Sequence, residues 1–148
     1  MDKLLNADIE KQIQKMFEAL KEPVAVLLFT SKVLPCDYCE EIRQLVTEVT
    51  ALSPKLSMQE FDLEQDAAAA AKYRVERAPS FVVAAKNGDV LEDTGVIFSG
   101  IPAQYEFAPF LAALLMVSKR DSGLSTATRS YLATLTRPLN LQVFTTPT

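Results

Sequence analysis

The strongest constraint on the fold is an uninterrupted apolar run near the start of the chain. Pro23 introduces six consecutive apolar residues, from Val24 to Phe29. A strand that is solvated on one face alternates apolar and polar residues, whereas a strand covered on both faces is apolar throughout. Parallel sheets packed by helices contain strands of this second kind. The run therefore predicts a buried central strand in an α/β fold.

Two amphipathic helices are predicted on either side of this strand, over residues 8–20 and about 37–52. In each of them, apolar residues recur at the spacing of one helix face. These residues are Ile9, Ile13, Met16, Phe17 and Leu20 in the first helix and Ile42, Leu45, Val46 and Val49 in the second. Ser53 and Pro54 are expected to end the second helix.

The central region continues the alternation of strands and helices. The predicted elements are a strand at about 56–63, a short helix at 64–73, a strand at 81–85, a strand at about 90–98 and a helix that follows Pro102. Asn87-Gly88 lies between the last two strands and is a strong hairpin signal. Pro109 lies within the last helical pattern, so that helix either begins near Ala108 or is kinked there.

The element order from residue 23 to 117 is thus β-α-β-α-β-β-α, which predicts a compact α/β sandwich. We expect residues 22–118 to form one domain, preceded by a helical extension over residues 1–21. The 148 residues of the chain suit one such domain and would strain to hold two.

Beyond this domain, residues 119–148 contain a predicted helix over 122–135 and a predicted strand from Leu139 to Phe144. This second segment repeats the pattern of the first strand, because each begins with proline and ends in Phe-Thr. A tandem repeat that is cut after its second opening strand has this form. An unpaired apolar strand invites pairing with another chain, so we also expect a homodimer through the C-terminal strand.

Composition excludes several functions. Lys and Arg total 15 against 19 Asp and Glu, and the resulting net charge of −4 argues against a nucleic-acid-binding surface. The longest apolar run, residues 107–117, is shorter than the about 20 residues of a membrane span. Residues 1–8 lack the apolar stretch of a secretory signal, so we expect a cytoplasmic protein without a membrane partner. The absence of histidine excludes Ser-His-Asp and Cys-His catalysis.

The two cysteines of the chain, Cys36 and Cys39, stand between a predicted strand and a predicted helix. Unpaired N–H groups and the positive end of the helix dipole stabilise a thiolate on Cys36 at this position. Cys39 lies one turn further along, where it can attack a mixed disulfide formed at Cys36. Asp37 acts in the opposite direction, because a carboxylate beside Cys36 disfavours the thiolate. This context favours redox chemistry.

Two other interpretations of the cysteine pair stay open. A structural zinc site takes four ligands, and two cysteines without histidine supply half of them. A dimer that pooled its four cysteines could still hold zinc or an iron–sulfur cluster. Two buried cysteines can also be chemically inert, although this is unusual for Cys-x-x-Cys at a strand–helix junction.

Pro79 stands at the start of a predicted strand and holds Ala78 in an extended conformation. The local sequence favours an ordinary trans proline at a strand start. The functional alternative is a cis peptide opposite the cysteine loop, which would leave the backbone of Ala78 free to pair with an extended substrate.

Together these motifs resemble the thioredoxin/glutaredoxin superfamily. The chain is similar in particular to the N-terminal unit of the protein disulfide oxidoreductases, glutaredoxin-like proteins built of two tandem thioredoxin-fold units. The segments that carry the resemblance are Pro35-Cys36-Asp37-Tyr38-Cys39, Tyr73 to Pro79, Asn87-Gly88, Phe98 to Ala103 and Glu106-Phe107. With the leading helix and the tail, the resemblance covers essentially the whole chain.

The resemblance implies a thioredoxin-like fold and thiol–disulfide exchange with protein substrates. It implies Cys36 as the nucleophile, Cys39 as the resolving thiol and Pro79 as a cis-proline. Ala78 would dock the substrate backbone, and Tyr38 matches a tyrosine of glutaredoxin-type sites. The expected partners are protein disulfides or dithiols and a disulfide reductase. No metal or other cofactor is expected besides the redox-active Cys36–Cys39 disulfide.

Two features depart from the family pattern. Thioredoxins carry a buried acid at the end of the strand before the active site, where this chain has Thr30. Proton transfer at Cys39 then falls to another group, with Glu41 or water as candidates. Family members also continue beyond the equivalent of Thr146-Pro147-Thr148 into a second Cys-x-x-Cys unit. We therefore expect residues 119–148 to be the linker helix and opening strand of a missing second unit.

Two other functions fit the same motifs. The fold could be a binding module whose thiols are incidental. It could also be an electron-relay domain that serves a reductase or peroxidase, because the chain resembles the N-terminal domain of alkyl hydroperoxide reductase flavoproteins.

Overall fold

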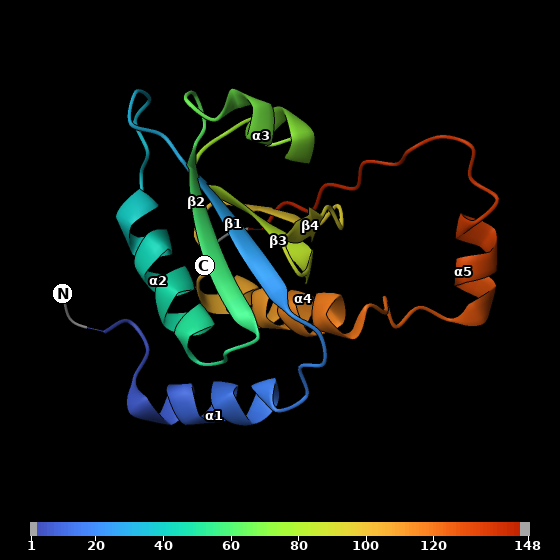
Figure 1. The fold of residues 1–148 in the computed structure, drawn as a ribbon, viewed down its shortest axis with the longest axis horizontal. Helices are drawn as coiled ribbons and strands as arrows, with labels where there is room; N and C mark the ends of the chain where they lie inside the picture. The colour runs from blue at the N-terminus through green and yellow to red at the C-terminus, as the bar shows by residue number, and fades with distance from the viewer. Residues whose placement is uncertain (1–2, 146–148) are drawn as a thin grey trace.

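The computed structural model describes residues 3–145, in which helices pack on both faces of a five-stranded sheet (Figure 1). Its elements are α1 (Ala7–Phe17), β1 (Val24–Thr30), α2 (Cys39–Ala51), β2 (Leu56–Asp62), α3 (Ala67–Tyr73), β3 (Ser80–Asn87), β4 (Val90–Glu92), β5 (Ile97–Ser99), a 3₁₀ turn (Gln104–Glu106), α4 (Phe107–Lys119) and α5 (Thr126–Leu132). The predicted α/β order is confirmed, with the strand at 90–98 divided into β4 and β5. No helix in the described range is long and apolar enough to cross a membrane.

The apolar run forms β1, which lies inside the sheet in the order β2-β1-β3-β4, with β5 also paired to β3. β1 is parallel to β2 and antiparallel to β3. All of its residues are buried. On one face, Val24, Val26 and Leu28 pack with α1, α2 and α4, and on the other, Ala25, Leu27 and Phe29 pack with α3. The predicted doubly covered strand is confirmed, in a sheet that is mixed rather than purely parallel.

The N-terminal helix α1 uses only part of its predicted apolar face. Ile13, Phe17 and Leu20 are buried in the core. Ile9 and Met16 were predicted to share that face, but their side chains are exposed. The stripe that contacts the core is therefore narrower than the periodicity predicts.

Asn6 caps the start of α1, where the first backbone N–H groups have no partner within the helix. Its side-chain oxygen accepts hydrogen bonds from the N–H groups of Asp8 (3.1 Å) and Ile9 (2.9 Å). We expect Asn6→Ala to lower the free energy of unfolding by about 1 kcal/mol, measured by urea denaturation. Asn6→Asp is the control and should stay near the wild type, because its carboxylate accepts the same bonds. An unchanged midpoint for Asn6→Ala would contradict the capping role.

α4 begins at Phe107, close to the expected start at Ala108, and contains Pro109 as its third residue. Proline is tolerated there because first-turn N–H groups have no acceptor within the helix. Phe110 is fully buried and meets the Phe81 ring of β3 edge-on, with 4.9 Å between the ring centroids. α4 is thereby anchored to the centre of the sheet.

Residues 121–145 form an arm that leads out to α5, which lies apart from the sheet, and that turns back after α5 (Figure 1). α5 is shorter than the helix predicted over 122–135. The strand predicted from Leu139 to Phe144 is wrong for the described structure, since residues 138–145 form neither helix nor strand. A strand requires a neighbour for its backbone hydrogen bonds, and no strand described here pairs with this segment. Its side chains are exposed as a result.

Candidate active site

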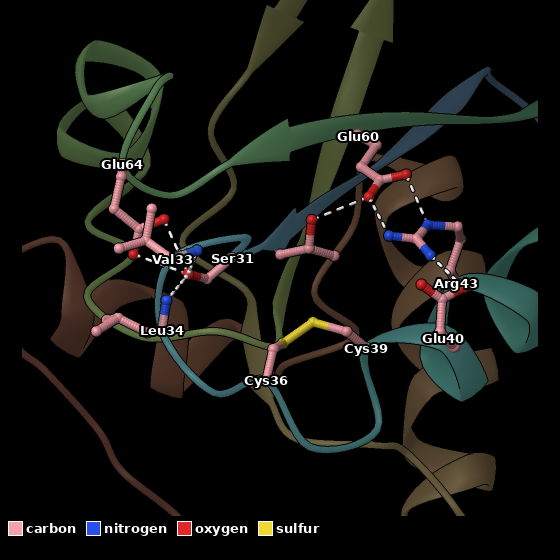
Figure 2. The surroundings of a disulfide bond; sticks show 10 residues. Ser31, Val33, Leu34, Cys36, Cys39, Glu40, Arg43, Glu60 and Glu64 are labelled. Atoms are coloured by element: carbon pink, nitrogen blue, oxygen red, sulfur yellow. Dashed lines mark hydrogen bonds and ion pairs between the residues drawn. A yellow bond between two sulfur atoms is a disulfide. The ribbon is translucent and has the colours of Figure 1, made fainter.

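The two cysteines form a disulfide at the junction between β1 and α2 (Figure 2). Cys39 is the first residue of α2 and is 7% exposed, whereas Cys36 is half-buried in the preceding loop. α2 begins two residues later than predicted, because the φ of Tyr38 is 68°, in the left-handed region. The Tyr38 side chain is exposed beside the disulfide loop. Solvent therefore reaches Cys36 more readily than Cys39.

Ser31 holds the loop that leads from β1 to Cys36. Its hydroxyl accepts hydrogen bonds from the N–H groups of Val33 (3.2 Å) and Leu34 (2.8 Å) and donates to the carboxylate of Glu64 (2.9 Å; Figure 2). Glu64 follows β2, so this contact ties the loop to the neighbouring strand. A serine that bonds to the N–H groups two and three residues later is a local turn signal. That signal was present in the sequence, but only the structure identifies Glu64 as the partner.

Pro79 lies at the same end of the sheet as the disulfide. Ser80 of β3 pairs with Phe29, the residue before the last of β1. The Ala78–Pro79 peptide bond is cis, as the family resemblance implied and against the trans form that the local sequence favoured. Both residues are half-buried, and the Pro79 carbonyl accepts a hydrogen bond from the N–H of Gly100 (2.9 Å). The structure thus brings the cysteine loop and Ala78-Pro79 to the same end of the sheet, where β1 ends and β3 begins.

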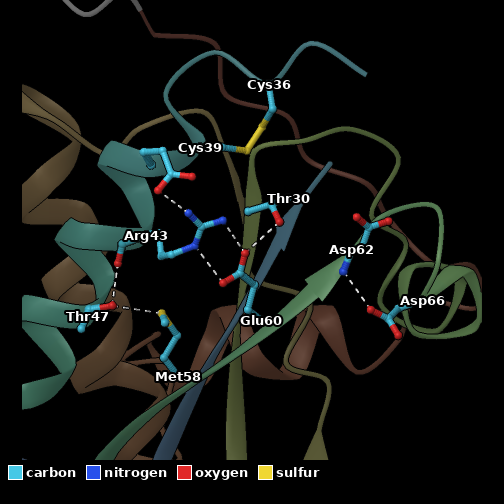
Figure 3. A network of polar contacts seen from close by, with 10 residues as sticks. Thr30, Cys36, Cys39, Arg43, Thr47, Met58, Glu60, Asp62 and Asp66 are labelled. Atoms are coloured by element: carbon cyan, nitrogen blue, oxygen red, sulfur yellow. Dashed lines mark hydrogen bonds and ion pairs between the residues drawn. A yellow bond between two sulfur atoms is a disulfide. The ribbon is translucent and has the colours of Figure 1, made fainter. Parts of the chain in front are cut away.

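A network of polar side chains lies behind the disulfide and was not predicted from the sequence (Figure 3). Arg43 of α2 donates two hydrogen bonds to Glu60 of β2, from Nε to Oε2 (2.8 Å) and from Nη2 to Oε1 (2.6 Å). Its Nη1 contacts Oε2 of Glu40 at 2.5 Å. The hydroxyl of the buried Thr30, at the end of β1, donates to Oε1 of Glu60 (2.9 Å). Thr30 stands where thioredoxins carry a buried acid. It is hydrogen-bonded to an acid, Glu60, on the neighbouring strand β2.

The charge state of Glu60 follows from these contacts. The hydrogen bonds from Arg43 hold the pKa of the Glu60 carboxyl below its ordinary value, with partial burial opposing them and the Thr30 hydroxyl adding to them. Glu41, which the sequence suggested for proton transfer, is exposed on α2. The available signal for Arg43 was its position four residues after Cys39, on the same helix face. Glu60 carried no such signal, because its contact depends on how β2 packs against α2.

A polar cavity of about 410 Å³ opens at the carboxyl ends of β1 and β2, next to this network. Asp62 lines it and is 7% exposed. Its Oδ1 accepts hydrogen bonds from the N–H groups of Glu64 (3.1 Å) and Gln65 (2.9 Å), which lower the pKa of the carboxyl, the bond from Gln65 most strongly. The other oxygen, Oδ2, has no hydrogen-bond partner among residues 3–145. The wall of the cavity therefore includes a carboxylate, and one oxygen of this carboxylate has no hydrogen-bond partner among the described residues.

Curated proteins that are similar to this chain include alkyl hydroperoxide reductases. The chain is 34% identical over 117 residues to the alkyl hydroperoxide reductase AhpF of Staphylococcus aureus and 30% identical over 117 residues to that of Staphylococcus epidermidis. The matches cover 79% of this chain but only 19% of each relative, so the chain spans about a fifth of their length. No family model matches the chain.

Solved structures share the fold of this chain. A protein disulfide oxidoreductase from Aeropyrum pernix has 28% sequence identity and a TM-score of 0.74, over 91% of this chain and 56% of that one. The chain is a thioredoxin/glutaredoxin-like unit. AhpF of Enterococcus faecalis shares the fold of this unit, with a TM-score of 0.76 at 23% identity over 88% of this chain and 61% of that one.

The thioredoxin-like unit has the features of an oxidoreductase with a redox-active Cys-x-x-Cys disulfide. The predicted similarity to the N-terminal unit of the protein disulfide oxidoreductases is confirmed. The predicted relation to alkyl hydroperoxide reductase flavoproteins is confirmed as well.

Proposed function

We propose that this chain exchanges disulfides with protein substrates through Cys36 and Cys39. The observation that supports the proposal most strongly is the Cys36–Cys39 disulfide itself, which joins a half-buried Cys36 in the loop to a buried Cys39 at the start of α2. An accessible thiolate is the attacking group in disulfide exchange, and a shielded neighbour resolves the product.

The proposed exchange balances as follows in the reducing direction. The Cys36 thiolate attacks a client disulfide, forms a bond to one client sulfur and releases the other as a thiolate. Cys39 then gives up its proton and attacks Sγ of Cys36, which forms the intramolecular disulfide and releases the second client thiolate. The client takes up two electrons, and its two thiolates take one proton from Cys39 and one from solvent. The cysteine pair loses two electrons and the proton of Cys39. A disulfide reductase or a small thiol is needed to restore the dithiol.

The surface around the disulfide suits an extended polypeptide. Val33 and Leu34 precede Cys36 in the sequence and are 72% and 57% exposed. Tyr38 follows Cys36, and its side chain is also exposed. Ala78, next to the cis-proline, is half-buried at the same end of the sheet. We propose that the backbone of Ala78 pairs with a client strand while these apolar side chains contact client residues.

Reduction of insulin by dithiothreitol tests the proposal. The wild-type chain should accelerate precipitation of the insulin B chain above the rate with dithiothreitol alone. The matched control, Cys36→Ser with Cys39→Ser, removes both sulfurs and should give only the background rate. A wild-type rate equal to background, or an unchanged rate in the double variant, would rule out catalysis by this site.

Electron relay to a peroxidase is the second candidate, favoured by the alkyl hydroperoxide reductase relatives. In this case, the reduced chain should pass its electrons to an oxidised two-cysteine peroxiredoxin faster than to insulin. The chain is first reduced and separated from small thiols, and it is then mixed with the peroxiredoxin or with insulin. The rate at which its cysteines become unreactive to an alkylating reagent measures the transfer. Faster transfer to insulin would favour the general exchange activity over the relay.

The domain organisation and assembly are part of the same proposal. Residues 22–118 would be the redox unit, and residues 119–148 the linker helix and opening segment of a second unit.

The exposed apolar side chains of Leu139, Leu141 and Val143 would favour a homodimer. Light scattering at high protein concentration checks this assembly, and a monomeric mass would count against it.

A further inference from the structure

The polar cavity at the carboxyl ends of β1 and β2 takes no part in the proposed exchange step. Thr30 and Asp62 are the last residues of the two strands, pair in register and both line the cavity. The loop that follows Thr30 leads to Cys36, and Figure 3 shows Thr30, Asp62 and the disulfide at this end of the sheet. The volume of about 410 Å³ lies within the range of small-ligand sites. A polypeptide that is bound to Cys36 therefore lies close to this cavity.

The carboxylate of Asp62 lacks a donor that its burial requires. Oδ1 accepts two hydrogen bonds, from the N–H groups of Gln65 and Glu64, which hold the pKa of this carboxyl below its ordinary value. The group is therefore ionised at neutral pH. Asp62 is only 7% exposed, and Oδ2 has no hydrogen-bond partner among residues 3–145. A buried charged oxygen without a donor is costly, so a ligand that brings a donor would be bound favourably.

The charge of the cavity wall favours a cationic ligand. The charged side chains that line the cavity are three carboxylates and two cations, namely Glu60, Asp62, Asp66, Lys32 and Arg43. Arg43 is already held by Glu60 and by Glu40. Asp62 and Asp66 then have the exposed Lys32 as the remaining cation among the described lining residues. The wall keeps an excess of negative charge.

An ammonium or guanidinium group fits this cavity better than a metal ion. Within residues 3–145, no group of three or more Cys, Asp or Glu side chains is arranged to hold a metal. An ammonium group needs fewer carboxylates, because its N–H donors also bond to neutral oxygens such as the amide oxygen of Gln65. The aliphatic part of a lysine or arginine side chain can contact Phe61, which is half-buried in the cavity wall.

We propose that the cavity receives a lysine or arginine side chain of the client, with the cationic group donating to Oδ2 of Asp62. The inference rests on the proposed exchange function and names its substrate class, protein disulfides with a basic residue near the reacting cysteine. Asp62 is then a specificity-determining residue, while the electrons pass only through Cys36 and Cys39. Lys32 repels the client cation, so its charge weakens the preference.

Binding is tested on the oxidised chain with two probes, Nα-acetyl-lysine methylamide and Nα-acetyl-norleucine methylamide. In ¹H–¹⁵N NMR spectra, the lysine probe should shift the amide signals of Glu64 and Gln65, whose N–H groups bond to Asp62. The norleucine probe has no charge and should leave them in place. Asp62→Asn should abolish the lysine shifts, because its Oδ1 still accepts both N–H bonds but its amide nitrogen accepts none. Asp89→Asn, in the exposed turn after β3, is the matched control and should keep the shifts.

Three results of this experiment would overturn the inference. They are equal shifts from the two probes, lysine shifts that persist in Asp62→Asn, and the absence of shifts from the lysine probe. Magnesium chloride alone should leave the amide signals of Glu64 and Gln65 unchanged, and a saturable shift with magnesium would replace the proposed subsite by a metal site.

The consequence for exchange is measured with pairs of disulfide peptides that differ only in lysine or norleucine, placed at successive positions beside the cysteine. At the best position, the lysine peptide should react about fivefold faster with the reduced chain than its norleucine partner. The ratio should fall close to one in Asp62→Asn and rise in Lys32→Gln. A ratio near one at every position in the wild type, or an unchanged ratio in Asp62→Asn, would contradict the subsite. The NMR experiment involves no thiol exchange, so a failure to reduce insulin is distinguished from a failure of this inference.

Discussion

Cys39→Ser is expected to stop turnover and to accumulate a covalent complex between the chain and its client. Cys36 remains half-buried in the loop and can still attack, so the mixed disulfide forms. Without the sulfur of Cys39 behind it, the complex has no internal nucleophile to resolve it. Non-reducing electrophoresis with insulin as client should show the complex, and added dithiothreitol should release it.

Cys36→Ser is the control for this trap. Cys39 is buried as the first residue of α2, so its sulfur should not capture insulin when Cys36 is replaced. The two variants therefore separate the attacking thiol from the resolving thiol. A complex formed by Cys36→Ser but not by Cys39→Ser would reverse the assigned roles, and a complex formed by neither would contradict exchange at this site.

Phe81→Ala is expected to lower the free energy of unfolding by about 3–5 kcal/mol, the largest effect on stability that we predict. The Phe81 side chain is fully buried in β3, stacks on Phe98 at 4.9 Å between ring centroids and meets Phe110 at the same distance. Truncation removes this aromatic contact from the centre of the core and leaves a cavity that the sheet and α4 cannot fully close. A loss of this size is a large part of the usual stability of a small domain.

Phe144→Ala is the matched control for this change. Phe144 has the same side chain, but it is 86% exposed in the arm, so its loss should change the unfolding free energy by less than about 0.5 kcal/mol. Urea denaturation followed by far-ultraviolet circular dichroism measures both variants. Equal effects of the two substitutions would contradict the assignment of the core.

The main features of the fold could be predicted from the sequence, because they depend on local patterns. The unbroken apolar run from Val24 to Phe29 indicated β1, and Asn87-Gly88 indicated the connection from β3 to β4. The spacing of Cys36 and Cys39 between the first strand and the next helix favoured redox chemistry, and the family resemblance implied the disulfide that the structure contains. Each of these signals lies within a few residues of the structure that it predicts.

Features that depend on distant parts of the chain were missed. Thr30 and Arg43 both bind Glu60, which reaches them only because β2 pairs with β1 and packs beside α2. The late start of α2 depends on the left-handed backbone of Tyr38, and helical periodicity does not report it. The segment from Leu139 to Phe144 has the composition of a strand, but composition cannot supply the neighbouring strand that it would need.

The most direct test of the account is a single-turnover exchange between the reduced chain and insulin, without any other thiol present. After acid quenching and alkylation, the mass of the chain reports whether Cys36 and Cys39 are free or joined. We predict that one Cys36–Cys39 disulfide forms for each insulin disulfide that is reduced. Insulin that stays oxidised while both cysteines stay free would contradict the central claim that this disulfide exchanges with protein substrates.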